Sequence, residues 1–213
     1  MLSQLEEVFI EETPDLVMVF GDTNSTLAGA LAASQLNLKL AHVEAGLRSF
    51  NWRMPEEKNR VIVDRLSDLL FCPTESARQQ LDREGRTEGV FVTGDIMLEG
   101  VRQTPRAPLA SLNQLGVDLT APFNVLTLHR AENCDSIDQF VEVLHWVKTY
   151  SAHPIIWPIH PRAAQRLSET DIDLSGIDVV PPQGYAIMLT LLEQAEMLFT
   201  DSGGLQKEAF FVE

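Results

Sequence analysis

Residues 16–35 read LVMVFGDTNSTLAGALAASQ, and this stretch decides the fold class. Leu16 to Phe20 form a continuous apolar run, as buried parallel strands do. The run ends at Gly21-Asp22-Thr23, and an Ala- and Leu-rich segment of helical composition follows from Ser25 to Gln35. A strand that passes through a short turn directly into a helix is the repeating unit of a parallel α/β sheet.

The same unit recurs along the rest of the chain. Further strands are expected at residues 39–43, 69–72, 90–93, 124–128, 155–157, 179–180 and 197–200. Helices are expected at residues 5–12, 25–35, 55–67, 74–84 and 136–150, from 162 onward, and in a segment ending at 192. Pro55 marks one helix start, since proline suits the first helical position. Apolar strands separated by helices predict parallel sheets that are covered on both faces.

The alternation breaks between about Gln103 and Pro122. Pro105, Pro108 and Pro122 and the polar residues around them are typical of a linker, with a short helix expected at 110–115. We therefore expect two doubly wound α/β domains with a cleft between them: residues 1–108, a linker at 109–122, and residues 123–213. The chain begins on a helix and ends one helix after the last strand, so we expect a fragment that lacks both termini.

Composition limits the functional classes. The 213 residues are 45% hydrophobic and carry a formal net charge of −15, which argues against nucleic acid or an anionic membrane surface as partner. No apolar run approaches the roughly 20 residues that cross a bilayer. Cys72 and Cys134 have no metal-ligand spacing and are expected to be small buried residues. These features predict a cytoplasmic protein.

Three acids follow expected strands or begin an expected helix. Asp22 and Glu44 come directly after strands, where α/β proteins present side chains to ligands, and Glu56 lies in a first helical turn. Each also has a structural explanation. Asp22 could cap the helix that follows, Glu44 could pair with Arg48, and an acid in a first turn is favoured by the helix dipole.

The second half supplies basic groups at equivalent junctions. His129-Arg130 and the pair His160 and Arg162 each follow a strand, which favours contact with an anion or acid–base chemistry. Ser202-Gly203-Gly204 would let a phosphate approach the backbone at a helix start. A tight turn that needs positive φ is the alternative for the glycines. Glu208, one helical turn later, could reach hydroxyl groups such as those of a ribose, or it could be a solvated helix residue.

Seven motifs occur in an order and spacing that resemble the UDP-N-acetylglucosamine 2-epimerase family, mainly its non-hydrolysing branch. The resemblance runs from about Asp15 to Phe210. The motifs are GDT (21–23), HVEAGLR (42–48), MPEEKNR (54–60), TGD (93–95), HRAEN (129–133), PIHPR (158–162) and DSGGLQKE (201–208).

The resemblance implies two Rossmann-like domains in a GT-B-like arrangement, with the nucleotide sugar between them. It also implies inversion at C2 of UDP-GlcNAc to give UDP-ManNAc, by anti elimination of UDP to 2-acetamidoglucal and re-addition to the opposite face. The implied site residues match by position: Asp22, Glu44, Glu56 and His129 as catalytic groups, Ser202, Gly203 and Gly204 at the phosphates, Glu208 at the ribose, and Arg130 and His160 in the cleft.

The resemblance further implies no metal and no cofactor, a UDP-sugar substrate, a second UDP-GlcNAc as activator in some bacterial members, and a homodimer at full length. Some features depart from the family pattern. No Gly-Thr-Arg-Pro-Glu-like opening is found, and Lys207 and Arg65 stand where many members have an acid and a histidine. Four alternatives stay open: an epimerase for UDP-diacetamido-glucuronic acid, a hydrolysing 2-epimerase, a GT-B glycosyltransferase, and a non-catalytic UDP-sugar-binding module.

Overall fold

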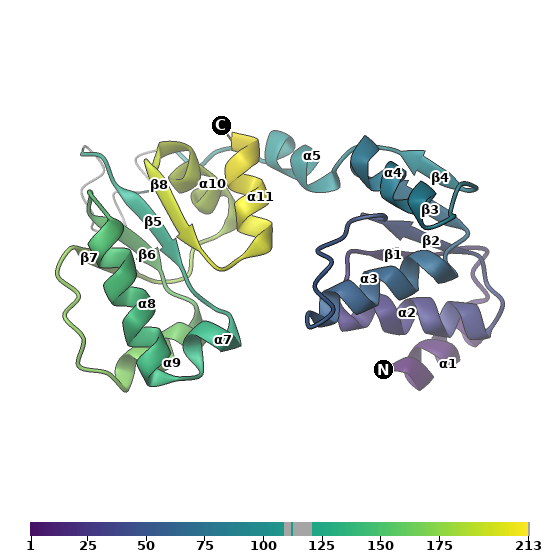
Figure 1. Ribbon diagram of the computed structural model, residues 1–213, viewed down its shortest axis with the longest axis horizontal. Helices are drawn as coiled ribbons and strands as arrows, with labels where there is room; N and C mark the ends of the chain where they lie inside the picture. Colours follow the sequence, from purple (N-terminus) through teal and green to yellow (C-terminus); the bar gives the residue numbers. More distant parts are fainter. Residues whose placement is uncertain (109–111, 113–120, 213) are drawn as a thin grey trace. The chain divides into compact units, whose positions relative to one another are not determined.

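A computed structural model describes residues 1–108, 112 and 121–212 (Figure 1). The chain divides into two compact units, Met1–Ile96 and Met97–Glu213, each built on its own parallel sheet. The sequence predicts a first domain that extends to residue 108, whereas residues 97–108 belong to the second unit. The physical reason is apolar burial, because Val101 packs against Leu189 and Leu192 of that unit.

The first unit contains sheet A, with the strand order β1-β2-β3-β4. All neighbouring strands are parallel, so a helix connects each strand to the next. The elements in chain order are α1 (Leu2–Glu12), β1 (Val17–Phe20), α2 (Asn24–Gln35), β2 (Leu40–Val43), α3 (Pro55–Leu66), β3 (Leu69–Cys72), α4 (Glu75–Arg83) and β4 (Val90–Val92).

The core of the first unit lies on one face of sheet A. Val17 and Val19 of β1 pack against Ala30 and Ala33 of α2, together with Val63 of α3. A second cluster joins β3 to α4 and includes Leu70, Cys72, Ala77 and Leu81. Strand alternation points the intervening residues to the opposite face, where Met18, Phe20 and Phe91 are about half exposed.

The second unit contains sheet B, with the strand order β7-β6-β5-β8, also parallel throughout. Its order reverses at β5, which has β6 on one side and the last strand on the other. The elements are α5 (Ile96–Gln103), β5 (Asn124–Thr127), α7 (Ala131–Cys134), α8 (Ile137–Tyr150), β6 (Ile155–Pro158), α9 (Pro161–Ser168), β7 (Ile177–Val180), α10 (Tyr185–Gln194), β8 (Met197–Thr200) and α11 (Gly203–Val212).

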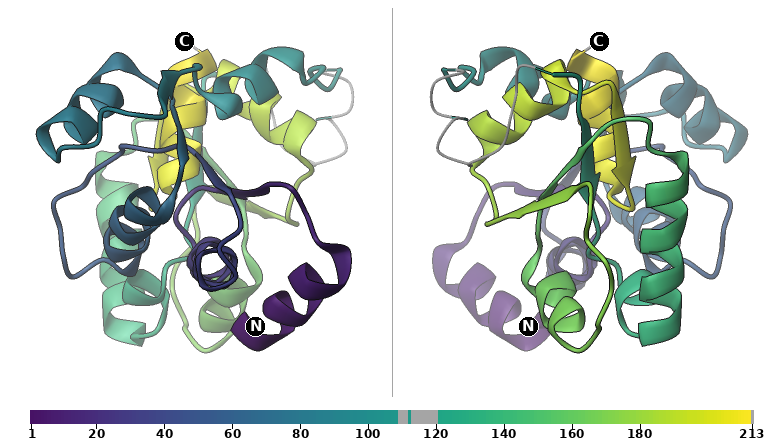
Figure 2. Two further views of the ribbon diagram at one scale, coloured as in Figure 1. Left: turned by 90° about the vertical axis from the view of Figure 1, so that its right-hand side faces the viewer. Right: turned by 90° about the vertical axis from the view of Figure 1, so that its left-hand side faces the viewer.

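Helices cover both faces of sheet B. On one face, Trp157 and Leu126 pack against Phe140 and Leu144 of α8. On the other face, Val125, Ile156 and Val180 pack against Leu191 of α10, among others. Figure 2 shows α8 and α10 on opposite sides of the strands. The β5 turn point and the carboxyl ends of its neighbours are where doubly wound sheets bind ligands.

The strands expected from the sequence are confirmed, with ends that differ by one or two residues. The helix starts differ by up to three residues. Helices α5 and α7 were not predicted, because each is short and α5 contains Gly100. The short helix expected at 110–115 lies outside the described residues except for position 112. Cys72 and Cys134 are both buried, as expected.

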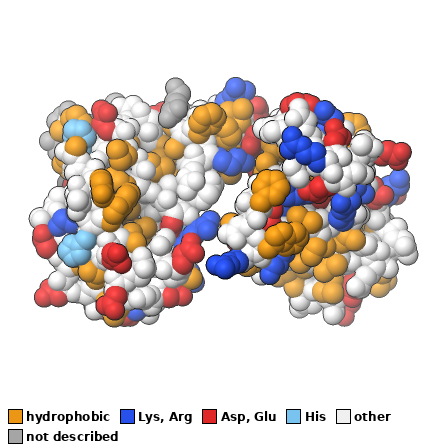
Figure 3. Space-filling model, viewed as in Figure 1, with side chains coloured by type: hydrophobic (Ala, Val, Ile, Leu, Met, Phe, Trp, Pro, Cys, Tyr) orange, Lys and Arg blue, Asp and Glu red, His pale blue; other side chains and the backbone are white. Residues whose placement is uncertain are grey.

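Among the described residues, no helix is long and apolar enough to span a membrane. Apolar side chains reach the surface of both units on the face that Figure 3 shows. The most exposed large ones in the chain include Phe50, Trp52 and Phe210.

Candidate functional site

Asp22 lies at the carboxyl end of β1, in contact with α3. Its carboxylate is paired with the guanidinium of Arg60, and its backbone carbonyl accepts a hydrogen bond from Asn59 at 2.8 Å. Thr23 caps helix α2, because its hydroxyl accepts from the backbone N–H of Thr26. The helix therefore does not need Asp22 as its cap, and the capping explanation for Asp22 is wrong.

Glu44 lies at the end of the neighbouring strand β2. Its φ is 72°, a left-handed conformation that costs a non-glycine residue energy and is concentrated at functional sites. Its Oε2 atom is 3.4 Å from the point that a Cβ on Gly21 would occupy, so Glu44 lies against the turn that carries Asp22. Glu44 thus lies beside the turn that precedes Asp22, at one edge of sheet A.

Glu56 and Glu57 are neighbours in the first turn of α3, yet they differ in environment. Glu57 is 1% exposed and accepts hydrogen bonds from the backbone N–H groups of Ser49 (2.7 Å) and Phe50 (3.0 Å) and from the Ser49 hydroxyl (2.8 Å). Burial raises the pKa of Glu57, but these hydrogen bonds outweigh burial and hold it below its ordinary value.

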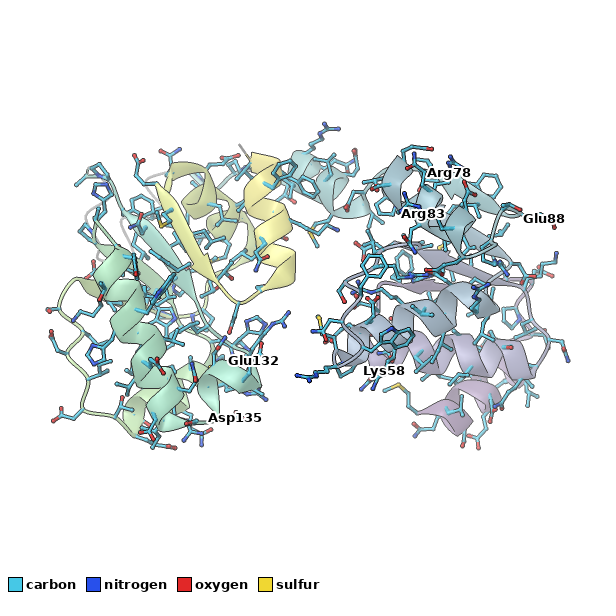
Figure 4. All side chains as sticks on the ribbon, viewed as in Figure 1. Lys58, Arg78, Arg83, Glu88, Glu132 and Asp135 are labelled. Carbon is cyan, nitrogen blue, oxygen red and sulfur yellow. The ribbon has the colours of Figure 1, made fainter. Side chains whose placement is uncertain are left out.

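The two neighbours of Glu57 in the sequence are more open: the Glu56 side chain is partly exposed, and Lys58 is exposed (Figure 4). Glu57 therefore fixes the loop that precedes α3, and Glu56 remains accessible to a ligand. Arg60, on the same helix, pairs with Asp22 and also contacts Glu57. Its Nη1 atom lies 3.5 Å from Glu57 Oε2.

The carboxyl edge of sheet B is organised by Asp201. Its Oδ2 atom accepts from the backbone N–H groups of His129 (3.0 Å) and Arg130 (2.9 Å) and from the Asn133 amide (3.1 Å), and its Oδ1 atom lies 2.7 Å from His129 Nδ1. Burial raises the pKa of Asp201, but these donors outweigh it and lower the pKa overall. Asp201 thus holds the turn after β5 against the turn after β8.

His129 and His160 lie side by side at this edge, with ring centroids 5.8 Å apart. Asp201 accepts the proton on Nδ1 of His129, which leaves Nε2 for a ligand. The Nδ1 of His160 accepts from the backbone N–H of Arg162, and the Arg162 guanidinium donates to the carbonyl of His129 at 3.3 Å. Two imidazoles and an arginine therefore share one edge.

Gly203 and Gly204 begin α11, and neither has positive φ. A Cβ on Gly203 would lie 4.0 Å from Arg130 Nη2, and a Cβ on Gly204 would meet its nearest atoms at 3.8 Å. These are ordinary contacts, so the fold does not require glycine at either position. The alternative that this turn merely needs positive φ is wrong.

The Ser202 hydroxyl caps α11 by accepting from the N–H of Leu205 at 3.2 Å. The start of a helix next to an arginine can bind an anion, because backbone N–H groups and positive charge converge there. Glu132 on α7 lies 3.7 Å from the Arg130 guanidinium (Figure 4).

Glu208 is the sixth residue of α11, one helical turn after Gly204, and it hydrogen-bonds with the Tyr185 hydroxyl at the start of α10. Burial raises the pKa of Glu208, and the Tyr185 hydrogen bond opposes that shift in part. A half-buried carboxylate with one hydroxyl donor can still accept from a polar ligand.

These groups line one hollow of about 350 Å³ in the second unit. Its lining includes His129, His160, Ser202, Gly204 and Glu208, together with Pro182, Gln183 and Met188. The hollow therefore brings these five sequence-indicated residues together, whereas Arg130 and Gly203 are not part of its lining. The first unit places Asp22 and Glu44 on neighbouring strand-end turns, with Glu56 on helix α3.

Sequence reasoning missed several residues that shape these edges. Arg60, Glu57 and Asp201 all lie inside the recognised motifs, but no local feature distinguishes them from solvated residues. Arg60 stands three residues after Glu57, on the same helix face, and this i,i+3 spacing was the available signal for their contact.

The family model described as UDP-N-acetylglucosamine 2-epimerase matches residues 1–213. The chain belongs to this family. A UDP-N-acetylglucosamine 2-epimerase homolog of Methanococcus maripaludis is 42% identical over 221 residues, covering 100% of this chain and 61% of that protein. The UDP-2,3-diacetamido-2,3-dideoxy-D-glucuronate 2-epimerase of Pseudomonas aeruginosa is 44% identical over 220 residues, covering 99% and 60%.

Solved structures of the 2-epimerase family have the same fold. The Methanocaldococcus jannaschii UDP-GlcNAc 2-epimerase in complex with UDP-GlcNAc and UDP superposes with a TM-score of 0.81 at 40% identity, over 99% of this chain and 61% of that one. The fold of two parallel four-stranded sheets is thus GT-B-like, as predicted. The chain spans about 60% of the length of the relatives it matches.

Proposed function

We propose that the protein containing this chain inverts C2 of a UDP-linked 2-acetamido sugar, converting UDP-GlcNAc to UDP-ManNAc. The observation that carries the proposal is the glycine pair of α11. Gly203 and Gly204 have space for a Cβ and no positive φ, yet Gly203 lies beside Arg130 and Gly204 lines the hollow that also includes His129 and Glu208. Close approach of a diphosphate to the helix start explains why both positions lack a side chain.

The reaction proceeds through an alkene. A carboxylate of the first unit takes the C2 proton while the C1–O bond breaks. The electron pair of the C1–O bond leaves with the UDP oxygen. The C–H electrons form the C1–C2 double bond of 2-acetamidoglucal. UDP then returns to C1 as a proton is delivered to the opposite face of C2. Asp22, Glu44 and Glu56 are the carboxylates available for the two proton transfers, and His129 is a further acid–base group.

The second unit holds the nucleotide in this proposal. Ser202, Gly203 and Gly204 bind the diphosphate, Arg130 and His160 offset its charge, and Glu208 accepts from the ribose hydroxyls. The negative charge on the departing UDP grows as the C1–O bond breaks. Groups already placed around the phosphates therefore stabilise the transition state more than the bound substrate.

The test is solvent exchange at C2. UDP-GlcNAc incubated in D2O with the complete protein should acquire deuterium at C2 and form UDP-ManNAc, both visible by NMR. Asp22→Asn and Glu56→Gln should each lower exchange by at least about 100-fold, because each removes a proton-transfer group, while UDP still binds. Glu7→Gln, an exposed acid on α1, is the matched control and should leave exchange unchanged. Exchange that survives in both site variants would refute the acid–base roles.

A second candidate substrate is UDP-2,3-diacetamido-glucuronate, favoured by the 44% identity to the Pseudomonas aeruginosa relative. The same exchange assay with that nucleotide decides between the two, because the true substrate gives the higher kcat/KM. Release of free ManNAc and UDP would indicate a hydrolysing enzyme. UDP binding without deuterium at C2 of either sugar would indicate a binding module.

A further inference from the structure

Beneath the edge of sheet A, His42 on β2 is buried between two oxygen atoms. Its ring is 0% exposed, its Nδ1 atom lies 2.7 Å from Asp64 Oδ1, and its Nε2 atom lies 2.8 Å from the carbonyl of Gly21. A carbonyl oxygen can only accept a hydrogen bond, and so can an ionised carboxylate. Both ring nitrogens of His42 therefore face hydrogen-bond acceptors, and donation to both requires the protonated ring.

Asp64 of α3 is ionised for an independent reason. Its Oδ2 atom accepts from Arg48 Nη1 at 2.7 Å and from the backbone N–H of Gly46 at 3.1 Å. Asp64 is 1% exposed and the Arg48 side chain 3%, so water does not screen this pair. Burial lowers the pKa of Arg48, but hydrogen bonds and charges from Glu84 and Asp64 outweigh it and keep the guanidinium charged.

The network touches both turns that carry the proposed catalytic acids. Through His42 it holds the carbonyl of Gly21, the residue before Asp22. Asp64 itself accepts the hydrogen bond from the N–H of Gly46, two residues after Glu44. Only glycine fits at position 46, because a Cβ there would lie 2.4 Å from the carbonyl oxygen of Ala77. Asp64 thus contacts one strand-end turn directly and the other through His42, and these two turns carry Asp22 and Glu44.

We propose that Asp64 is a positioning residue for C2 inversion, acting through His42 on the Gly21–Asp22 turn and through Gly46 on the Glu44 turn. This inference rests on the proposed function. Asp64 takes no direct part in the chemistry in this proposal, because its side chain is 1% exposed and both of its carboxylate oxygens already have protein partners. Loss of the network should lower kcat and leave UDP binding intact, because the groups proposed to hold UDP lie in the other unit.

Asp64→Asn separates positioning from bulk charge. The oxygen of the introduced amide can accept from Arg48 and Gly46, and its NH2 group can donate to Nδ1 of a neutral His42 whose Nε2–H still donates to Gly21. The substitution removes one negative and one positive charge together and keeps every hydrogen bond. Asp64→Ala removes the bonds, and His42→Phe removes the two bonds of the ring while keeping a similar volume.

The experiment measures kcat and KM for C2 exchange, with UDP affinity by calorimetry, in the complete protein. Asp64→Ala and His42→Phe should each lower kcat by on the order of 100-fold, the cost of a small displacement of catalytic groups, with KM and UDP affinity within about 3-fold. Asp64→Asn should keep kcat within about 5-fold of the unaltered protein, a rescue expected if the hydrogen bonds matter. If Asp64→Ala does not fold, His42→Phe provides the same comparison.

Three results would overturn the inference: kcat retained in His42→Phe or Asp64→Ala, kcat lost equally in Asp64→Asn and Asp64→Ala, or UDP affinity lost in step with kcat. Failure of the proposed function itself is seen separately. In that case the unaltered protein places no deuterium at C2 of either nucleotide sugar, and both proposals fall.

Discussion

Asp201 Oδ1 lies 2.7 Å from Nδ1 of His129, although the two residues are 72 positions apart in the chain. The His129 side chain is 39% exposed and Asp201 only 7%. A buried carboxylate therefore fixes the orientation and the tautomer of a histidine whose other nitrogen is open to a ligand.

Asp201→Asn should invert that tautomer. The introduced amide would donate to Nδ1 of His129, so Nε2 would carry the proton and could no longer accept one. We expect C2 exchange to fall by about 100- to 10,000-fold, with UDP affinity changed by only a few-fold. The free energy of unfolding should fall by about 1–3 kcal/mol, because backbone donors lose a charged acceptor. Asp178→Asn, an exposed residue of β7, is the control, and equal losses in both variants would contradict the prediction.

Gly204→Ala should separate stability from binding. The added Cβ meets no atom closer than 3.8 Å, and alanine suits a helix better than glycine, so stability should rise by about 0.4–1 kcal/mol. UDP affinity should fall at least about 10-fold, because the methyl group occupies the space of the diphosphate. Gly100→Ala in α5, with nothing within 4 Å, should give the stability gain alone. Thermal unfolding and calorimetry measure both quantities, and unchanged UDP affinity in Gly204→Ala would remove the phosphate assignment.

Glu208→Gln should weaken UDP binding without weakening the fold. Burial disfavours the charged form of Glu208 and raises its pKa, so a neutral amide at this position loses no net stability at neutral pH. The amide oxygen can still accept from Tyr185. We expect the free energy of unfolding to stay within about 1 kcal/mol of the unaltered value. Tyr185→Phe is the control, because it keeps the Glu208 carboxylate, and Glu208→Gln should bind UDP several-fold more weakly than this control. Equal affinities in the two variants would argue against a ribose contact by Glu208.

Glu57→Gln should change how stability depends on pH. The pKa of Glu57 in the folded protein lies below its ordinary value of 4.5, so the unfolded chain binds the proton more tightly. Its contribution is complete above 4.5 and is lost as the pH falls through the folded-state pKa. The variant should lose about 1–3 kcal/mol at neutral pH and less near pH 3, measured by urea unfolding. Glu56→Gln, its half-exposed neighbour, should change stability by less than about 0.5 kcal/mol. A constant loss at every pH in Glu57→Gln would contradict the assignment.

The strands and most helices could be predicted from the sequence because their signals are local. Leu16 to Phe20 and Met197 to Thr200 are short apolar runs bounded by turn residues. Such a run indicates a buried strand without reference to any distant residue. The motifs likewise place Asp22, His129 and Ser202 at strand ends. The sequence therefore indicates which residue types form the site and that they lie at the carboxyl edges of the two sheets.

Only the tertiary structure distinguishes residues whose local signals are the same. Glu56 and Glu57 share one helical turn, but only Glu57 meets the backbone N–H groups of Ser49 and Phe50. Asp64 lies 22 residues from His42, and no periodic pattern connects them. The sequence by itself determined the alternation of strands and helices and the chemistry at their ends. Which acids became buried anchors and which stayed open was decided by packing, because burial and hydrogen bonding depend on neighbours that are distant in the chain.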